Sequence, residues 1–336
     1  MIVDAHNHVI PETIISYLEK DPETFGVSVD GTGDHRRLVH REGFAYPMFA
    51  EFLDPVEKVR KLDERGLDMA VISPSPTLFF YRIAGGRNAE FVRLLNEQIA
   101  EFVRSAPKRL IGMGTLPMQS PEASIAEIDY LVDELGMRAV MIGTHIDGVQ
   151  LADPTLRPVL RHAAARGIFI LTHPYYFGSK PGLEPYYLTN LIGNPLDTTV
   201  MAAHLIFSGA MEEIPDLKIC LSHGGGFAPY QIGRLVHGWK VRPEAKTVTR
   251  SPKELLRRFY FDTITHDAEA LRYLVSFAGA DHVLMGTDIP FDMADPDPIA
   301  TLADIGLDER SRHRIVAGNA IDLCAAVNVR SLANVS

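Results

Sequence analysis

Residues 1–8 read MIVDAHNH, a short apolar run that ends in two histidines one residue apart. The apolar residues predict a buried β-strand, in which successive side chains point to opposite faces. His6 and His8 therefore share one face and can direct two imidazoles at one point. Two convergent neutral imidazoles suit a Zn²⁺-like ion. Alone, the motif fits a His-x-His in a surface loop equally well, so the rest of the chain has to decide.

The remaining chain alternates short apolar, β-rich runs with longer helical stretches. The expected strands are residues 2–5, 69–73, 110–114, 139–142, 168–172, 218–222, 259–262 and 283–286. The expected helices are residues 55–66, which carry charges on one face, 88–105, 120–136, 155–167, 198–214 and 267–278. The alternation predicts a parallel sheet, and eight repeats favour an α/β fold of the closed (β/α)₈ TIM-barrel type. An open doubly wound sheet is the alternative, although no G-x-G-x-x-G motif follows the first strand.

Two stretches interrupt this alternation. Residues 11–53 are polar and Gly-rich, and residues 175–197 are rich in aromatic residues, Pro and Gly. Long connections that follow barrel strands lie at the face of the barrel where active sites form. We interpret the first stretch as a small insertion after strand one and the second as a lid segment, within a single domain that spans residues 1–336.

The composition limits the class of protein. The chain has 336 residues, of which 46% are hydrophobic, so one large core is expected. The formal net charge of −10 argues against a nucleic acid or an anionic membrane as partner. No stretch approaches the roughly 18 apolar residues of a membrane span, and no basic leader precedes an apolar one, so we expect a cytoplasmic protein. Cys220 and Cys324 form no CxxC pair and are expected to be small buried hydrophobes.

Polar residues with metal-binding chemistry follow several of the expected strands. His6 and His8 end the first strand, His173 the fifth, His223 the sixth and Asp288 the eighth. A lone His after an apolar run is usually a core or capping residue, and a lone Asp is usually a helix cap. Five such residues at four strand ends, on the catalytic rim of a barrel, instead predict a metal centre.

This pattern resembles the amidohydrolase superfamily, which has HxH on strand one, His on strands five and six, and Asp on strand eight. Binuclear members also carry a bridging carboxylate or a carbamylated Lys at strand four, whereas residues 138–145 read RAVMIGTH without Lys or Glu. A mononuclear site is therefore expected. The resemblance implies that His6, His8, His173 and Asp288 are the ligands. A water would take the fifth position, with its pKa lowered by the ion.

Further motifs narrow the resemblance. They are residues 114–119 GTLPMQ, 142–145 IGTH, 173–174 HP, 223–226 HGGG, 233–234 GR and 286–291 GTDIPF. Together they resemble the aminocarboxymuconate-semialdehyde decarboxylase branch, which also holds decarboxylases of hydroxylated aromatic acids. The resemblance implies one divalent metal, usually Zn²⁺ and sometimes Mn²⁺, and the nonoxidative loss of CO₂. It makes His223 the acid–base residue beside Asp288, which agrees with the ability of imidazole to move a proton near pH 7.

The residues expected to bind substrate match the resembled branch less closely than the metal ligands do. In the resembled branch the Arg that matches Arg234 reaches a substrate carboxylate in the neighbouring subunit, which implies a homodimer; a solvent-facing Arg is the alternative. The branch also places an Arg shortly before an aromatic-Asp-Pro sequence, and no Arg precedes Asp54 in that register. Arg82 is a possible substitute, and Tyr175 stands where the branch tends to have Trp. The substrate is therefore expected to be a related small carboxylate and not that of the branch's namesake.

Three functions remain open at this point. The first is a metal-dependent decarboxylase of a small unsaturated or hydroxylated aromatic carboxylic acid, in which a metal-bound water and His223 handle the proton. The second is a hydrolase or hydratase of a small carboxylate, lactone or amide on the same scaffold, because a metal-activated water suits both reactions. The third is a non-catalytic barrel with a structural metal, which the presence of His223 argues against. Release of CO₂ without net addition of water separates the first two.

Overall fold

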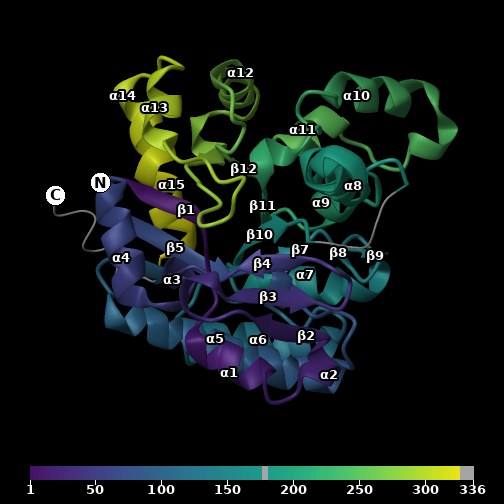
Figure 1. Cartoon of the computed structure of the whole chain (residues 1–336). Helices are drawn as coiled ribbons and strands as arrows, with labels where there is room; N and C mark the ends of the chain where they lie inside the picture. The colour runs from purple at the N-terminus through teal and green to yellow at the C-terminus, as the bar shows by residue number, and fades with distance from the viewer. Residues whose placement is uncertain (176–180, 326–336) are drawn as a thin grey trace.

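Eight parallel strands form the centre of the computed structural model, which describes residues 1–175 and 181–325 (Figure 1). They are β1 (Val3–Val9), β5 (Met69–Pro74), β6 (Leu110–Gly112), β7 (Ala139–Gly143), β10 (Phe169–His173), β11 (Lys218–Leu221), β12 (Tyr260–Asp262) and β13 (Val283–Leu284). Almost every residue in them is buried, which fits parallel strands that are covered on both faces. Each strand coincides with an expected one to within a few residues.

The strands close into a ring. The hydrogen-bonded orders are β1-β5-β6 and β13-β12-β11-β10-β7. Two isolated parallel bridges join these sheets, between Gly114 and Val140 on one side and between Asn7 and Ile289 on the other. The second bridge is extended by hydrogen bonds from Ala5 N to Met285 O and from His8 N to Ile289 O. This order confirms the expected (β/α)₈ architecture.

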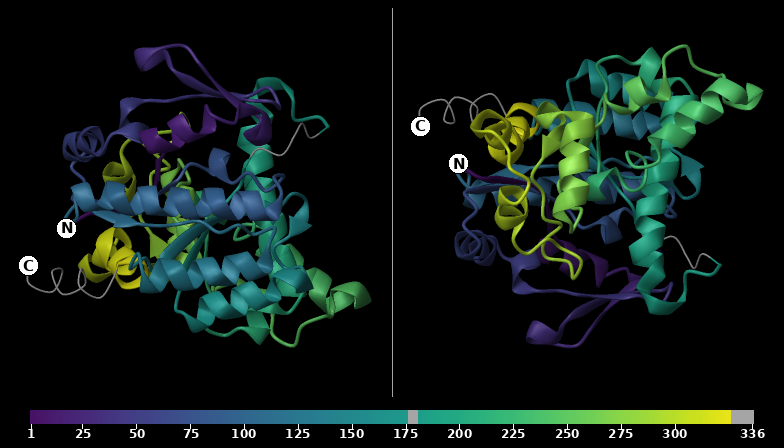
Figure 2. Two further views of the ribbon diagram at one scale, coloured as in Figure 1. Left: turned by 90° about the horizontal axis from the view of Figure 1, so that it is seen from below. Right: turned by 90° about the horizontal axis from the view of Figure 1, so that it is seen from above.

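Helices surround the ring of strands (Figure 2). They are α4 (Pro55–Glu64), α5 (Gly85–Ser105), α6 (Pro121–Asp133), α7 (Arg157–Ala165), α8 (Asn194–Phe207), α9 (Ala210–Glu213), α10 (Ile232–Val241), α11 (Pro252–Leu256), α12 (Ala268–Ala278), α13 (Pro298–Ala303), α14 (Glu309–His313) and α15 (Asn319–Cys324). Local sequence explains several starts: the Asp54 and Asp267 carboxylates accept hydrogen bonds from the first turns of α4 and α12. The single helix expected at residues 198–214 is wrong, because Gly209 adopts φ +79° and separates α8 from α9.

The insertion after β1 contains a small antiparallel sheet. Its elements are α1 (Glu12–Leu18), α2 (Pro22–Phe25), β2 (Val27–Asp30), β3 (Arg37–His40), β4 (Ala45–Pro47) and α3 (Ala50–Leu53). Strand β3 pairs with both neighbours, with His40 opposite Val27 and Leu38 opposite Tyr46. Figure 2 shows this sheet, in dark purple, at one side of the molecule beside α1. Of the expected lid at residues 175–197, residues 176–180 lie outside the described residues, and the remainder leads through short helical turns into α8.

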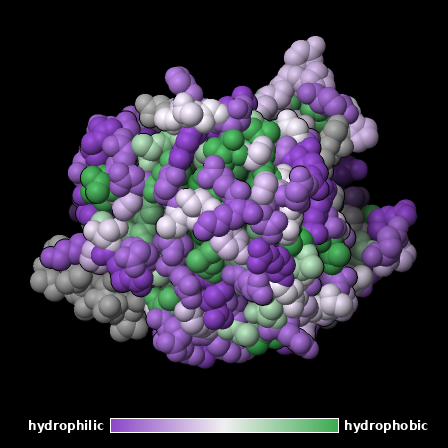
Figure 3. Space-filling view, turned by 60° about the horizontal axis from the view of Figure 1, so that its bottom comes forward, coloured by the Kyte–Doolittle hydropathy of each residue, from purple (hydrophilic) through white to green (hydrophobic). Residues whose placement is uncertain are grey.

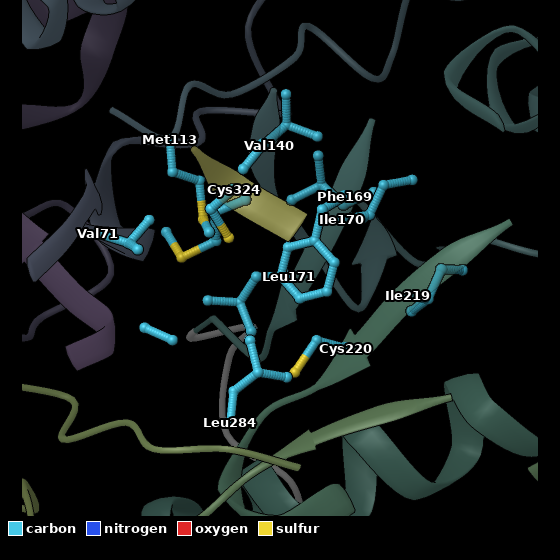
Figure 4. Close-up of a cluster of buried hydrophobic side chains, with 14 of the residues drawn as sticks. Val71, Met113, Val140, Phe169, Ile170, Leu171, Ile219, Cys220, Leu284 and Cys324 are labelled. Atoms are coloured by element: carbon cyan, nitrogen blue, oxygen red, sulfur yellow. The ribbon is translucent and has the colours of Figure 1, made fainter. Parts of the chain in front are cut away.

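Apolar side chains fill the space inside and around the strands (Figure 4). Leu171, Cys220 and Cys324 are part of this core, and both cysteines are free thiols. Burial raises the pKa of the Cys220 thiol, so it behaves as a small hydrophobe as expected. Figure 3 shows mainly hydrophilic residues on one face of the molecule, with smaller apolar patches between them. Among the described residues, no helix is both long and apolar enough to cross a membrane.

Candidate metal centre and active site

The strand ends bring four of the predicted residues together. His6 and His8 lie in β1, His173 is the last residue of β10, and Asp288 follows β13. All four are buried, and one ligand atom of each lies within 4.8 Å of the others. Three imidazole nitrogens and one carboxylate oxygen therefore converge at the carboxyl ends of three different strands.

The converging atoms are close enough to share one ion. The Nε2 atom of His6 lies 3.1 Å from Nε2 of His8, which is 2.8 Å from Oδ1 of Asp288. The same Oδ1 lies 3.4 Å from Nε2 of His173 and 3.5 Å from Nε2 of His6. The other ring nitrogen of each histidine faces an acceptor: the Asp262 carboxylate at 2.8 Å, the Pro74 carbonyl at 3.2 Å and the Pro174 carbonyl at 2.6 Å.

This arrangement fits a divalent cation. Because carbonyl and carboxylate oxygens only accept hydrogen bonds, each Nδ1 carries a proton and each Nε2 directs its lone pair inward. Two inward lone pairs 3.1 Å apart, on His6 and His8, repel unless a positive charge lies between them. A metal ion satisfies this requirement with the nitrogen and oxygen ligands that Zn²⁺ commonly takes in proteins.

The protonation of these groups agrees with ligand chemistry. Burial lowers the pKa of His8 to about 4 and that of His173 to about 3. Burial opposes ionisation of Asp288, but the surrounding imidazoles of His173, His223, His8 and His6 hold its pKa well below the usual range. His6 differs: burial lowers its pKa, but the hydrogen bond to Asp262 and nearby carboxylates raise it overall. His6 therefore binds a proton more readily than His8 or His173 does.

His223 lies beside this cluster. It follows β11, and its Nε2 is 3.4 Å from Oδ2 of Asp288. Its ring centroid is 4.9 Å from that of His173. Its side chain is 16% exposed, against 6% for His173, and both residues line the same cavity. A substrate in the cavity can therefore reach His223, which is the position required of an acid–base group.

Two buried residues at the site were not predicted from sequence. Asp262, the last residue of β12, accepts a hydrogen bond from His6. In the sequence, a lone Asp at the end of a strand indicates a helix cap and not a partner of a metal ligand. Lys58 belongs to the charged face of α4, yet it is fully buried and burial lowers its pKa to about 8. Its Nζ donates to Oδ1 of Asn7 at 2.6 Å and to the carbonyl of His8 at 3.1 Å, and so supports β1 from behind. A strand-end carboxylate was a visible signal for Asp262, whereas the sequence contains none for Lys58.

A cavity of about 1480 Å³ opens over the cluster and extends beneath the insertion. His173, His223 and Asp288 line one part of it. Aromatic residues supply much of the remaining wall: Phe25, Phe44, Tyr46, Phe49, Phe52, Phe80, Tyr81, Tyr175, Tyr187, Phe227, Tyr230 and Phe291. Such a wall suits a flat, largely apolar ligand with a few polar groups.

The predicted substrate-binding residues occupy different places. Arg82 lines the cavity, but its guanidinium lies 3.1 Å from carboxylate oxygens of both Glu42 and Asp147. Tyr175 also lines it, and its hydroxyl accepts a hydrogen bond from Asp147 N at 3.1 Å. Arg234 is exposed on α10 and does not line the cavity. The structure thus brings two of the three to the cavity.

Comparison with known proteins agrees with this geometry. A model of an amidohydrolase family matches residues 3–323. The chain belongs to this amidohydrolase family. Family membership and the buried donor set together identify a site for a divalent metal ion.

Relatives of this amidohydrolase include enzymes of two reaction types. The chain is 32% identical over 324 residues to 2-amino-3-carboxymuconate-6-semialdehyde decarboxylase of Dictyostelium discoideum, covering 95% of this chain and 90% of the relative. It is 23% identical over 351 residues to 2-keto-4-carboxy-3-hexenedioate hydratase of Sphingobium, covering 95% and 94%.

Solved structures share the fold. The 5-carboxyvanillate decarboxylase of Sphingomonas paucimobilis superposes with a TM-score of 0.82 at 22% identity, covering 96% of this chain and 98% of that one. A dihydroxybenzoic acid decarboxylase of Polaromonas, solved with bound manganese and 2-nitroresorcinol, gives 0.78 at 22% identity, covering 96% of both chains.

Proposed function

We propose that this amidohydrolase is a metal-dependent, nonoxidative decarboxylase of a small unsaturated or hydroxylated aromatic carboxylic acid. The observation that carries the proposal is the position of His223, beside the four-residue metal site and at the wall of a cavity rich in aromatic side chains. The decarboxylase of Dictyostelium discoideum, with 32% identity over nearly the whole chain, supports the same reaction class.

The residues present account for the chemistry of this reaction. Loss of CO₂ breaks the bond between the carboxylate and its ring or alkene carbon, and a proton takes the place of CO₂ on that carbon. Imidazole is suited to deliver this proton near neutral pH, and we assign this step to His223. Asp288, 3.4 Å away, accepts a hydrogen bond from the protonated imidazole and so stabilises it. A divalent ion held by His6, His8, His173 and Asp288 supplies Lewis-acid stabilisation of the developing negative charge.

We further propose Zn²⁺ as the metal, because imidazole nitrogens and carboxylate oxygens are ligands that Zn²⁺ commonly takes in proteins. Mn²⁺ is the alternative, supported by the manganese in the Polaromonas structure. Metal analysis of the purified protein, followed by reconstitution with each ion, decides between them. Activity with Mn²⁺ alone would contradict the zinc assignment.

Substrate contacts are proposed from the cavity wall. Tyr175 is proposed to contact the flat body of the substrate, and Arg82 to fix the cavity wall through its two acidic partners.

Because Arg234 lies outside the cavity, we propose that it contacts the substrate in the cavity of a second copy in a homodimer. The expected result for Arg234→Ala is a raised KM with an unchanged fold. A monomeric protein of full activity would contradict this part of the proposal.

A hydratase is the second candidate, supported by the Sphingobium relative that matches 95% of this chain. Dihydroxybenzoates, carboxyvanillate-like acids and muconate semialdehydes, incubated with the metal-loaded protein, test both candidates. The decarboxylase predicts release of one CO₂ for each substrate consumed. Consumption without CO₂, with a product heavier by one water, would overturn it in favour of the hydratase.

A further inference from the structure

Asp262 contacts both a proposed metal ligand, His6, and the backbone of the proposed acid–base residue, His223. It ends β12 and is 1% exposed. Its Oδ2 lies 2.8 Å from Nδ1 of His6 and also accepts a hydrogen bond from the backbone N of His223 at 2.9 Å. Its Oδ1 accepts from the backbone N of Gly224 at 2.8 Å and from that of Ile264 at 3.2 Å. Four donors therefore converge on one buried carboxylate.

The contact with His6 determines how that residue meets the metal. By accepting the Nδ1 proton, Asp262 fixes the tautomer of the imidazole and leaves the Nε2 lone pair directed at His8 and Asp288. Partners of this kind commonly change metal affinity 10- to 100-fold when they are removed.

The contacts with His223 and Gly224 determine the shape of a strained loop. His223 has φ +54°, in the left-handed region that non-glycine residues rarely adopt, and Gly224 has φ +61°. A Cβ on Gly224 would lie only 2.8 Å from Cγ2 of Thr265, so this loop packs tightly against the segment that follows β12. The carboxylate of Asp262 binds two consecutive amides at this bend and fixes the backbone from which the His223 imidazole projects.

We propose that Asp262 is a positioning residue that couples metal binding to proton delivery, because one carboxylate holds both His6 and the His223 loop. The inference rests on the proposed function for the role of His223, whereas its metal-binding half is measurable without any substrate. An asparagine at this position retains the size of the side chain. Its NH₂ group, which replaces one carboxylate oxygen, cannot accept a hydrogen bond. The contact with either His6 or the His223 loop is therefore lost.

The test uses the full-length Asp262→Asn variant, freed of metal with a chelator. Titration with Co²⁺, followed by its visible absorption, gives the metal affinity and reports the ligand geometry. Hydrogen exchange of a peptide covering residues 218–231 reports the amides of the His223 loop. We expect Kd for Co²⁺ to rise about 10- to 100-fold. We also expect faster exchange of the loop, with a fall in kcat that saturating metal does not restore.

Glu127→Gln is the matched control. Glu127 is also a buried carboxylate, 3% exposed, and accepts hydrogen bonds from Asn96 and Arg93 at 2.8 Å between α5 and α6. This variant is expected to lower stability and leave the Co²⁺ affinity unchanged. If Asp262→Asn does not fold, Asp262→Glu keeps the charge but displaces the carboxylate by one methylene, and the same two changes are expected.

The outcomes separate the inference from the proposed function. A variant that binds Co²⁺ as tightly as the wild type, or whose loop exchanges no faster, overturns the shared role of Asp262 alone. A wild-type chain that binds no Co²⁺ overturns the proposed function and this inference together.

Discussion

At the residue scale, neighbouring histidines of the site differ in what surrounds them. His173 is buried and its Nδ1 bonds the Pro174 carbonyl, which leaves Nε2 for a metal. His223 is partly exposed to the cavity, and its backbone is anchored by Asp262. These surroundings suit the different purposes proposed for two rings whose centroids are 4.9 Å apart, His173 as a ligand and His223 as a proton carrier.

The first prediction separates these purposes. His223→Ala is expected to retain the metal and to lower kcat about 10²- to 10⁴-fold, the usual contribution of a general acid or base. His173→Ala is expected to lower metal affinity as well, because it removes a ligand. Metal content and CO₂ release measured on both variants test the assignment. Full turnover by a metal-loaded His223→Ala protein would contradict it.

The second prediction concerns His40, which lies in the cavity wall outside the metal site. Its ring stacks on Phe44 at 5.4 Å, and burial lowers its pKa to about 4. In the unfolded chain the His40 imidazole has its ordinary pKa near 6.5. As the pH falls, it is therefore protonated in the unfolded chain before it is protonated in the folded protein. The contribution of His40 to the free energy of unfolding is therefore fully present above about pH 6.5. It is lost progressively as the pH falls towards 4.

His40→Phe removes this titration. Between pH 7 and pH 5 the wild type is expected to lose about 2 kcal/mol more of its free energy of unfolding than the variant does. Urea denaturation of both metal-free proteins at the two pH values measures the difference. An equal loss in both proteins would show that His40 titrates normally in the folded state.

The metal ligands were predictable one residue at a time because each follows an apolar run, and a barrel gathers such strand ends at one rim. Asp262 stands in the same kind of position, yet its role depends on His6, 256 residues away in sequence. No local pattern distinguishes a carboxylate that orients a ligand from one that caps a helix. Residues of this kind therefore emerge only when the strands are placed beside one another.

At the element scale, helix α4 shows where a charge pattern misleads. Lys58 is one of several charged residues, acidic and basic, on this helix, but α4 packs so that its amino group reaches the end of β1. Glu51 of α3, 3.5 Å from Lys58 Nζ and held by Arg65 at 2.6 Å, completes a buried ionic group. The group ties the insertion, the first barrel helix and the metal-bearing strand to one another.

The third prediction tests this group. Lys58→Met keeps the length of the side chain but leaves the acceptors on Asn7 and His8 without their donor, at an expected cost of about 3 kcal/mol in the free energy of unfolding. Lys61→Met on the same helix removes a partly exposed Lys–Glu pair and is expected to change it by less than about 0.5 kcal/mol. Chemical denaturation of the two variants measures both values. Similar effects would mean that Lys58 contributes as an ordinary surface charge.

At the scale of the whole molecule, the eight-strand order was predictable because apolar runs and helices alternate so regularly. The sheet of the insertion was not. Its strands are three or four residues long, and in β2 and β4 most of the residues are at least partly exposed. Such strands lack the continuous apolar signal of the barrel strands, and pairing with one another and packing over the barrel stabilise them.

The closure of the ring leads to the last prediction. Outside the β1–β5–β6 ladder, β1 meets the segment after β13 through an isolated bridge and a few hydrogen bonds. The proposed ligands come from both sides of this junction: His6 and His8 from β1, and Asp288 from the segment that follows β13. A bound metal therefore joins the first and last strands of the barrel, and its removal is expected to loosen this junction before the rest of the fold.

A metal present at about 1,000 times its Kd stabilises the folded state by about 4 kcal/mol. Removal with a chelator is therefore expected to lower Tm by several degrees and to speed hydrogen exchange in residues 3–9 and 286–291, with both effects reversed by added Zn²⁺. The His8→Ala variant lacks one ligand. Its Tm is therefore expected to stay near that of the metal-free wild type, with or without added Zn²⁺. Exchange that rises equally around all eight strands would instead indicate that the metal stabilises the barrel without joining its ends.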